Sequence, residues 1–245
     1  MSAVALVTGA RGGIGRELVC LLRVAGHRVV AVGRDGASLQ AVAADGHVAA
    51  DVTTPEGAAH AVAEATRLMG APPALLAHCV GSTLIAPIHR TTAEQYREVM
   101  RVNLDSAFYM LSAWQAPLRE GKLPGAAVLA SSVVSRVGVA NHEAIAAAKG
   151  GIEALARGMA ATYAAQGLRV NVVAPGMTDT PMTASMLKTD AQREGAGKQY
   201  PPGGVQTAAE VADAMAWLLS PEARRITGQV LAVDGGFSHT RPLVR

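Results

Sequence analysis

Hydrophobic and polar positions follow two alternating patterns along the chain. Short runs of β-branched and other apolar residues recur seven times, and stretches of helix length separate them. Strands that are almost continuously apolar are typical of a parallel sheet that helices cover on both faces. The strand-like runs are 4–8, 28–32, 47–50, 74–77, 126–130, 168–173 and 229–233, and the main helix-like stretches are 14–25, 56–69, 92–118, 143–166 and 207–219.

This alternation predicts one α/β domain over residues 1–245. We expect a Rossmann-like, doubly wound sheet of seven parallel strands in a three-layer α/β/α sandwich. Residues 182–206 depart from the pattern, because they form a long insert with little periodicity after the sixth strand. Long inserts in compact domains are more often functional than accidental, and ligands bind at the carboxyl edge of such sheets. The insert is therefore predicted to be a mobile substrate lid; a surface loop without function is the alternative.

Composition narrows the function further. Half of the residues are hydrophobic and 17% are charged, which excludes a disordered chain. The net charge is +3 without a dense Lys/Arg run, so we expect no nucleic-acid binding. No apolar run reaches 18 residues and no signal peptide follows Met1, so we expect a cytoplasmic protein without a membrane span. Cys20 and Cys79 lack metal-ligand spacing, which favours reduced thiols and no metal site.

A glycine-rich turn follows the first strand and leads directly into a helix. Gly9 permits the sharp turn, Gly13 lets the backbone approach a pyrophosphate, and Gly15 allows close packing of helix and strand. The helix N-terminus presents free N–H groups and partial positive charge to phosphates. This context predicts a dinucleotide site. The turn residues that we assign to the cofactor are Gly9, Arg11, Gly12, Gly13, Ile14 and Gly15.

The end of the second strand bears on the choice of cofactor. NAD-selective sites usually place an acidic residue there, whereas this chain has Gly33 followed by Arg34. Arginine can bind a 2′-phosphate in bidentate fashion, and Arg11 lies in the neighbouring turn. We therefore expect NADP(H). Asp35 leaves NAD(H) possible, and Arg34 as a solvated turn residue is the alternative.

Two further strand ends are predicted to contact the cofactor. The third strand leads to Asp51 and Val52, and the Asp51 carboxylate is suited to accept a hydrogen bond from the adenine amino group. The fourth ends in a segment that contains Cys79 and Gly81, and the missing side chain at Gly81 lets the backbone pass close to the cofactor.

Together with motifs farther along, these residues resemble the short-chain dehydrogenase/reductase family over essentially the full length of the chain. The resemblance implies a nicotinamide cofactor, a small-molecule substrate and a homotetramer or homodimer. It also implies that Lys149, Pro175, Gly176, Thr178 and Thr180 contact the cofactor. The matching positions are the turn Thr8–Gly15, Asp51, Asn103 in Val102-Asn103-Leu104, Ser132 in Ser131-Ser132, Lys149, Pro175-Gly176 with Thr180, and Asp234-Gly235-Gly236.

Two positions depart from the family pattern. The family's Asn-Asn-Ala-Gly segment starts with His78 here, which we interpret as a structural histidine at a strand end. The family also places a catalytic tyrosine four residues before the lysine and thirteen after the serine. Counting from Lys149 or from Ser132 leads to the same residue, Ile145. The resemblance therefore implies a catalytic centre that lacks its tyrosine.

The missing tyrosine changes the expected chemistry. In the family the tyrosine exchanges a proton with the substrate oxygen, the serine hydrogen-bonds that oxygen, the lysine tunes the tyrosine and holds ribose, and the asparagine orders a water. A positioned general acid contributes about 10²–10⁴ in rate. Histidine has the best intrinsic pKa for replacing it, and His142 lies one turn before Ile145. Glu143 is a candidate to orient His142 or to act itself, and Tyr200 on the lid is a remoter candidate.

Three functional interpretations remain open. In the first, which we favour, the chain is an NADP(H)-dependent oxidoreductase acting on a small carbonyl or alcohol, with Asn103, Ser132, Lys149 and His142 as catalytic residues. In the second, the same scaffold performs non-redox work as an isomerase, dehydratase or cyclase. In the third, the chain binds NADP(H) without catalysis. Small residues crowd the stretch 143–166, which suggests close helix contacts and predicts a homo-oligomer, most simply a tetramer.

Overall fold

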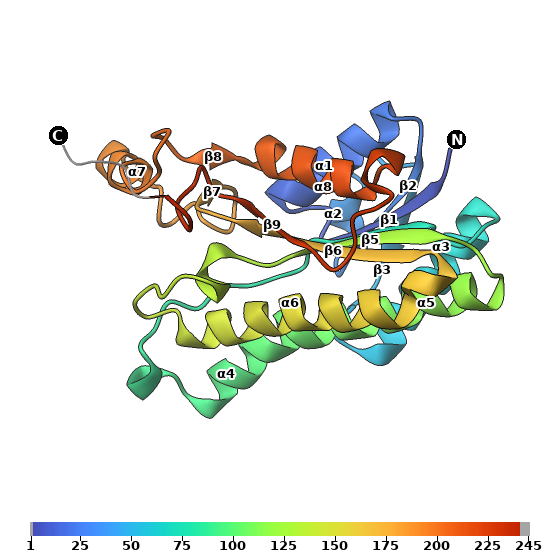
Figure 1. The fold of residues 1–245 in the computed structure, drawn as a ribbon, viewed down its shortest axis with the longest axis horizontal. Helices are drawn as coiled ribbons and strands as arrows, with labels where there is room; N and C mark the ends of the chain where they lie inside the picture. The colour runs from blue at the N-terminus through green and yellow to red at the C-terminus, as the bar shows by residue number, and fades with distance from the viewer. Residues whose placement is uncertain (1, 241–245) are drawn as a thin grey trace.

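The computed structural model describes residues 2–240, and within them seven parallel strands form one sheet (Figure 1). Their order, β3-β2-β1-β4-β5-β6-β9, reverses direction between β1 and β4, as in a doubly wound fold. The sheet confirms the predicted fold class. The strands are β1 (Val4–Thr8), β2 (Arg28–Gly33), β3 (Gly46–Ala49), β4 (Leu75–His78), β5 (Gly125–Ala130), β6 (Leu168–Pro175) and β9 (Val230–Val233).

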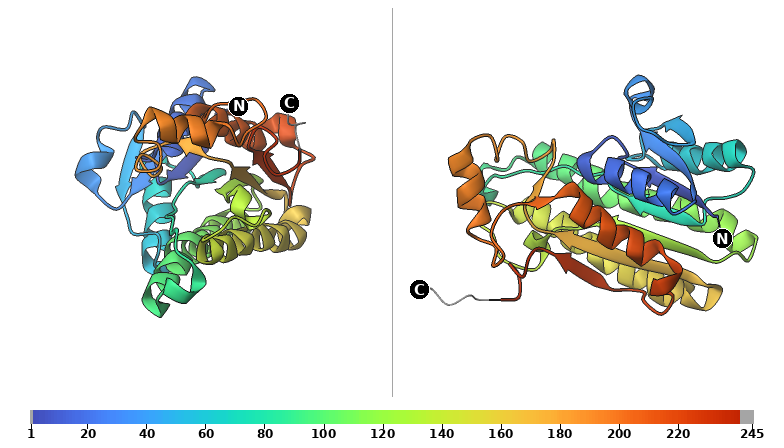
Figure 2. Two further views of the ribbon diagram at one scale, coloured as in Figure 1. Left: turned by 90° about the vertical axis from the view of Figure 1, so that its left-hand side faces the viewer. Right: turned by 90° about the horizontal axis from the view of Figure 1, so that it is seen from above.

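Helices cover both faces of this sheet, so that the molecule has three layers (Figures 1 and 2). Helices α3, α5 and α6 pack on one face, and α1 and α8 pack on the other. Each strand is apolar on both sides because both sides are covered. The helices are α1 (Gly13–Val24), α2 (Gly36–Leu39), α3 (Pro55–Met69), α4 (Ala93–Met100), α5 (Ser106–Glu120), α6 (Glu143–Tyr163), α7 (Asp190–Gly197) and α8 (Ala208–Leu219).

The predicted helix 92–118 is not one regular helix. A π-helical turn at Arg101–Asp105 separates α4 from α5. Asn103 lies in the middle of this turn and is fully buried, and its Nδ2 donates to Val99 O at 2.9 Å. Single π turns inside helices often mark functional sites. The hydrophobic period could not reveal this turn, because one widened turn barely changes the spacing of apolar positions.

The insert 182–206 has more structure than its weak periodicity predicts. It contains α7, whose N-terminus is closed by a capping box between Thr189 and Gln192. A two-residue strand β8 (Gln206–Thr207) pairs in parallel with β7 (Thr178–Asp179) just beyond β6. The insert lies past the carboxyl edge of the sheet, at the end of the molecule opposite the N-terminus (Figures 1 and 2). Its position agrees with a lid; its mobility, and the extent of the domain over 1–245, stay predictions.

Candidate active site

A cavity of about 400 Å³ opens at the carboxyl edge of the sheet. The glycine turn, the end of β4, the β5–α6 corner, the end of β6 and the insert 182–206 all contribute to its walls. Most of the sequence-predicted site residues meet here. Those that line the cavity are Gly12, Gly13, Ile14, Gly15, Cys79, Gly81, Ser132, His142, Lys149, Pro175, Gly176, Thr178 and Thr180. Those that lie outside its lining are Gly9, Arg11, Arg34, Asp51, Val52 and Asn103.

The glycine turn has the geometry of a phosphate cradle. Gly9 adopts a left-handed φ of +64°, and the Gly12 N–H donates to Gly9 O at 2.9 Å. Gly12 is the N-cap of α1 and has no side chain to cap the helix, so the first N–H groups of α1 remain available to an anion. A Cβ at Gly13 would lie 2.9 Å from Cγ2 of Thr180, so the opposing walls approach closely at this point. These features fit a dinucleotide pyrophosphate.

Two arginines flank the end of β2. Arg34 is exposed directly after the strand, and Arg11 Nη1 lies 3.7 Å from Asp35 Oδ2. Asp35 serves as the N-cap of α2, since its Oδ1 accepts from the Ala37 N–H at 3.1 Å. The one carboxylate that would favour NAD is thus already engaged by a helix cap and a cation.

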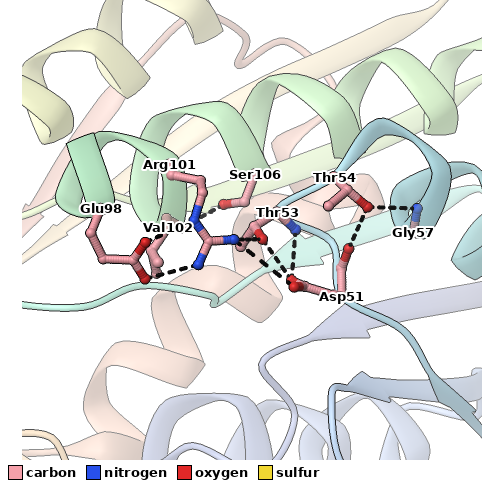
Figure 3. A network of polar contacts seen from close by, with 8 residues as sticks. All are labelled: Asp51, Thr53, Thr54, Gly57, Glu98, Arg101, Val102 and Ser106. Atoms are coloured by element: carbon pink, nitrogen blue, oxygen red, sulfur yellow. Dashed lines mark hydrogen bonds and ion pairs between the residues drawn. The ribbon is translucent and has the colours of Figure 1, made fainter. Parts of the chain in front are cut away.

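Asp51 belongs to a polar network rather than to the cavity lining (Figure 3). Its Oδ1 accepts from Thr53 Oγ1 at 2.7 Å, and its Oδ2 lies 3.9 Å from Nη1 of Arg101. The hydrogen bond from Thr53, opposed by desolvation and assisted by Arg101, lowers the pKa of Asp51. Arg101 also contacts Thr53 and pairs with Glu98, so it connects the turn after β3 to the π turn of Asn103. Val52 is buried in the core beside this network.

Gly81, Asn103 and Lys149 converge on one point. A Cβ at Gly81 would lie 3.1 Å from Asn103 Oδ1 and 3.2 Å from Lys149 Nζ. Asn103 is satisfied within the protein: its Oδ1 accepts from the Ser82 N–H, and its Nδ2 donates to Ser82 Oγ and to Val99 O. Asn103 therefore approaches the cavity only through the backbone at Gly81 and Ser82.

Lys149 is a buried ammonium at the base of the cavity. Its Nζ donates to Ala130 O at 2.9 Å, at the end of β5. Burial disfavours the charged form and lowers the pKa of Lys149 to about 8. Burial likewise raises the pKa of the neighbouring Cys79 thiol to about 12, which leaves this cysteine unreactive as a nucleophile.

Glu153 is a site residue that the sequence analysis missed. It lies one turn after Lys149 on α6 and is only 6% exposed. Its Oε1 accepts from Ser131 Oγ at 3.0 Å and from Ser135 Oγ at 2.5 Å, and Arg136 Nε approaches its Oε2 at 3.3 Å. These contacts hold the turn that carries Ser132 against α6. An acidic residue among small apolar ones on α6 was the available signal.

Ser132 and His142 present free polar atoms to the cavity. The Ser132 Oγ receives only a long hydrogen bond of 3.4 Å from the Val134 N–H, so its own proton remains available. His142 Nδ1 lies 2.7 Å from Ala140 O, and a carbonyl can only accept, so Nδ1 carries a proton. A neutral His142 therefore has its lone pair on Nε2. Ala140 O, and not Glu143, makes the described hydrogen bond to this ring.

Ile145 lies on α6, the helix of Lys149, and lines the cavity, but its side chain has no polar atom. It is 3% exposed and packs with Val99, Ala144 and Ala148, while Val134 packs against this cluster. Ile145 thus adds an apolar side chain to a cavity that Ser132, His142 and Lys149 also line.

Tyr200 reaches the cavity from the insert. Its hydroxyl accepts from the Met177 N–H at 2.6 Å, and its ring packs on Phe237 with centroids 5.2 Å apart. A Cβ at Gly176 would lie 2.8 Å from the Tyr200 ring, so Gly176 is needed to let the ring lie on the backbone. Burial raises the pKa of Tyr200. Phe237 is a lining residue that no sequence motif marked.

His78 is fully buried and lies outside the cavity lining. Ser106 Oγ donates its one proton to Val102 O at 2.6 Å, so His78 Nε2–H donates to Ser106 Oγ at 3.0 Å. The other nitrogen, Nδ1, then accepts from Thr8 Oγ1 at 2.8 Å. Burial lowers the pKa of His78 to about 3, and the ring stays neutral. The interpretation of His78 as structural is confirmed: it joins β1 and β4 to the start of α5.

The described residues also bear on membrane, metal and disulfide sites. Within residues 2–240, no helix combines the length and hydrophobicity needed to cross a bilayer. The same residues contain no cluster of three or more His, Cys, Asp or Glu side chains arranged for a metal ion. Cys20 and Cys79 form no disulfide, and Cys20 is exposed.

Comparison with known proteins gives consistent matches. A family model described as enoyl-(acyl carrier protein) reductase matches residues 9–238. Cis-4-hydroxycyclohexanecarboxylate dehydrogenase of Sinomonas cyclohexanicum is 37% identical over 244 residues, covering 96% of each chain. Inactive 2-(S)-hydroxypropyl-CoM dehydrogenase 2 of Xanthobacter autotrophicus is 37% identical over 223 residues, covering 87% of this chain and 96% of its own. A short-chain type dehydrogenase/reductase from Mycobacterium ulcerans superposes with a TM-score of 0.91 at 27% identity, covering 98% of this chain and 92% of its own.

Proposed function

The chain belongs to the short-chain dehydrogenase/reductase family, whose members use NAD(P)(H), and we propose that it transfers hydride between NADP(H) and a small carbonyl or alcohol substrate. The observation that carries the proposal is the shared cavity. The glycine turn and the helix N-terminus that fit a pyrophosphate open into the same cavity as Ser132, His142 and Lys149. A cofactor cradle and free polar atoms for a substrate oxygen thus lie side by side.

We assign the catalytic roles as follows. NADP(H), when bound, supplies or accepts the hydride. Ser132 Oγ–H donates a hydrogen bond to the substrate oxygen, and His142 Nε2 exchanges the proton with that oxygen. In ketone reduction the imidazolium gives its Nε2 proton to the oxygen, and in alcohol oxidation neutral Nε2 takes the proton. Lys149, whose Nζ donates to Ala130 O, would hold the ribose, and Asn103 supports the wall at Gly81.

The absence of a hydroxyl at Ile145 defines an altered catalytic centre in this proposal. Its test is a comparison of the natural protein, Ile145→Tyr and His142→Ala against a panel of small ketones, followed at 340 nm. Ile145→Tyr should raise reduction by about one to two orders of magnitude, as a positioned acid allows. His142→Ala should abolish the natural activity but cost little in the Ile145→Tyr background. No gain from Tyr together with no loss from Ala would reject both roles.

We propose NADP(H) over NAD(H) because two arginines flank the β2 end while Asp35 is engaged. The residues proposed to hold the cofactor are those assigned from the sequence, with Arg34 and Arg11 facing the 2′-phosphate. Calorimetry with NADPH and NADH tests this: the natural protein should favour NADPH, and Arg34→Asp should reverse the order. Equal affinity of the natural protein for both would contradict the choice.

A second candidate function is cofactor binding without hydride transfer. The apolar burial of Ile145 favours it, as does the similarity to a relative whose name describes it as inactive. Tight NADPH binding with no turnover across the ketone panel, for the natural protein and for Ile145→Tyr alike, would support this candidate instead.

We further propose a cytoplasmic homo-oligomer, a tetramer or a dimer. Exposed aromatic residues support an interface on two helices: Tyr96 on α4 is 44% exposed and Phe108 on α5 is 55% exposed. Both helices lie beside α6 on one side of the molecule (Figure 1). Light scattering at micromolar concentration should give a multiple of the 25.1 kDa chain mass, and a monomeric mass would contradict the proposal.

A further inference from the structure

Apolar side chains from several separate segments line the cavity around Ser132. They come from the loop after β4, the β5–α6 corner, the insert 182–206 and the stretch after β9. We call this set the apolar lining. It consists of Ile85, Val134, Ile145, Met182, Met186 and Phe237.

Fixed charge is almost absent from the same cavity. Among the described residues that line it, there is no Asp, Glu or Arg, and Lys149 is the only lysine. Its Nζ donates to Ala130 O, lies next to Gly81 and Asn103, and is assigned to the cofactor ribose in the proposed function; burial also brings its pKa down to about 8. The described lining thus offers no spare cation to a substrate carboxylate, phosphate or sulfonate, and an unpaired buried charge is strongly disfavoured.

The polar side chains of the lining other than Lys149 carry no fixed charge. Ser132 Oγ and His142 Nε2 are assigned to the substrate oxygen, and Ser82, Thr83 and Gln199 also line the cavity. The Tyr200 hydroxyl accepts from the Met177 N–H at 2.6 Å and keeps its own proton available to the cavity. These groups can form hydrogen bonds with an uncharged substrate, but none of them carries a fixed positive charge that could pair with an anion.

We propose that the substrate is an uncharged, largely apolar ketone or secondary alcohol. This inference rests on the proposed function for the location of the reacting oxygen. The apolar lining selects the hydrocarbon part, Ser132 and His142 bind the oxygen, and Ile145 contributes apolar surface where a hydroxyl would have met the substrate. Each additional buried methylene should raise kcat/KM by about fourfold until the cavity is full.

A matched pair of ring compounds tests charge at constant shape. 4-Isopropylcyclohexanol and 4-hydroxycyclohexanecarboxylate differ by an isopropyl group in place of a carboxylate of similar volume. With NADPH present neither alcohol can react, so calorimetry measures binding without turnover. The neutral alcohol should bind at least about 100-fold more tightly than the anion. Equal or tighter binding of the anion would overturn the inference.

Met186 provides a variant that changes charge alone. Its side chain lines the cavity and is half-buried, so a longer polar chain can be accommodated. Met186→Lys should improve binding of the carboxylate at least about tenfold, whereas Met186→Gln, of similar length but uncharged, should not. If Met186→Gln improved the carboxylate equally, charge would not be the selecting property and the inference would fail.

Failure of the proposed function gives a different result. If the neutral alcohol binds as expected but 4-isopropylcyclohexanone is not reduced by the natural protein or by Ile145→Tyr, hydride transfer is wrong and the ligand class stands. If the ketones are reduced but the carboxylate ketone is reduced as efficiently as the isopropyl ketone, the function stands and the ligand class is wrong.

Discussion

Two corners of the sheet edge build the candidate site by different means. The turn after β1 is made of glycine backbone: N–H groups, a left-handed φ at Gly9, and space that no side chain fills. The corner between β5 and α6 is made of buried side chains, with Lys149 and Glu153 both below a tenth exposed. A backbone site fails when atoms are added, whereas a buried ionisable site responds to charge and pH.

Adding one methyl group to the glycine turn should have the largest effect. A Cβ at Gly15 would lie 2.4 Å from Gly9 O and 2.9 Å from Ala10 Cα, and both contacts are to backbone. Gly15→Ala should destabilise the fold by about 3 kcal/mol and abolish NADPH binding. Gly12→Ala, whose Cβ would meet Gly9 O at 3.2 Å, is the milder control. Urea unfolding and calorimetry measure both. Near-natural stability of Gly15→Ala would show that this corner tolerates added atoms after all.

Removing the buried carboxylate should loosen the second corner. In Glu153→Ala, Ser131 and Ser135 lose their hydrogen bonds to the carboxylate and keep only the carbonyls of Lys149 and Ser132 as acceptors, while Arg136 loses its ion-pair partner. We expect a loss of about 2 kcal/mol in the free energy of unfolding, since hydrogen bonds to a charged group contribute about 1.5–3 kcal/mol. The control is Glu17→Ala on α1, an exposed acid, which should change stability by less than about 0.5 kcal/mol. Equal effects of both variants would contradict a structural role for Glu153.

The buried charge of Lys149 should destabilise the ligand-free fold while the side chain contributes to cofactor binding. Its pKa of about 8 lies below that of an unfolded lysine, so the folded protein holds an unfavourable buried charge at neutral pH. Lys149→Met should therefore stabilise the ligand-free protein by about 1–2 kcal/mol at pH 7, after subtracting the lost bond to Ala130 O. Cofactor affinity should fall.

The stability difference between the natural protein and Lys149→Met should depend on pH. Below pH 8 the lysine is charged in the folded and in the unfolded state, so burial of the charge destabilises the natural protein to its full extent. Between about pH 8 and 10.5 the folded state releases its proton first, so the natural protein gains stability relative to Lys149→Met. Urea unfolding of both proteins at pH 7 and pH 10 should show the gap between them closing. A gap that stays constant with pH would mean that Lys149 is not destabilised by burial.

The smallest effect should come from a glycine with free space around it. Gly158 on α6 is exposed, and a Cβ there would have no described atom within 4 Å. Gly158→Ala should stabilise a single chain by about 0.5–1 kcal/mol, because alanine loses less backbone entropy in a helix. Thermal unfolding measures the change in stability, and light scattering measures the mass of the assembly. If the variant is more stable and its assembly mass is unchanged, Gly158 lies outside any interface between chains. If the assembly mass falls, Gly158 lies in such an interface, and added atoms are disfavoured there as they are at Gly15.

Several features of the site were predictable because their signals are local. The seven strands follow from short apolar runs, and the cradle follows from four glycines within seven residues at the turn from a strand into a helix. The spacing from Ser132 to Ile145 to Lys149 also lies within eighteen residues of sequence. In each case neighbours along the chain fix the geometry, so pattern and structure agree.

Other features had no local signal. Tyr200 and Phe237 meet although they are 37 positions apart in the sequence, and Glu153 finds its partners 17 to 22 residues earlier. Asp51 looked like a free strand-end carboxylate; Thr53 is its neighbour in sequence, but only the tertiary placement of the π turn brings Arg101 to it (Figure 3). The π turn at Asn103 was hidden because hydrophobic spacing hardly changes across it.

The sequence by itself determined the sheet, the helices and the position of the glycine cradle, because hydrophobic period and glycine conformation act over a few residues. Tertiary structure decided which side chains share the cavity, which charges are buried and which hydrogen bonds are already taken. Those properties depend on distances between segments that are remote in the chain, and burial is what shifts the ionisation of Lys149 and His78. A residue type in a motif states what chemistry is available, and the packing around it decides what that residue does.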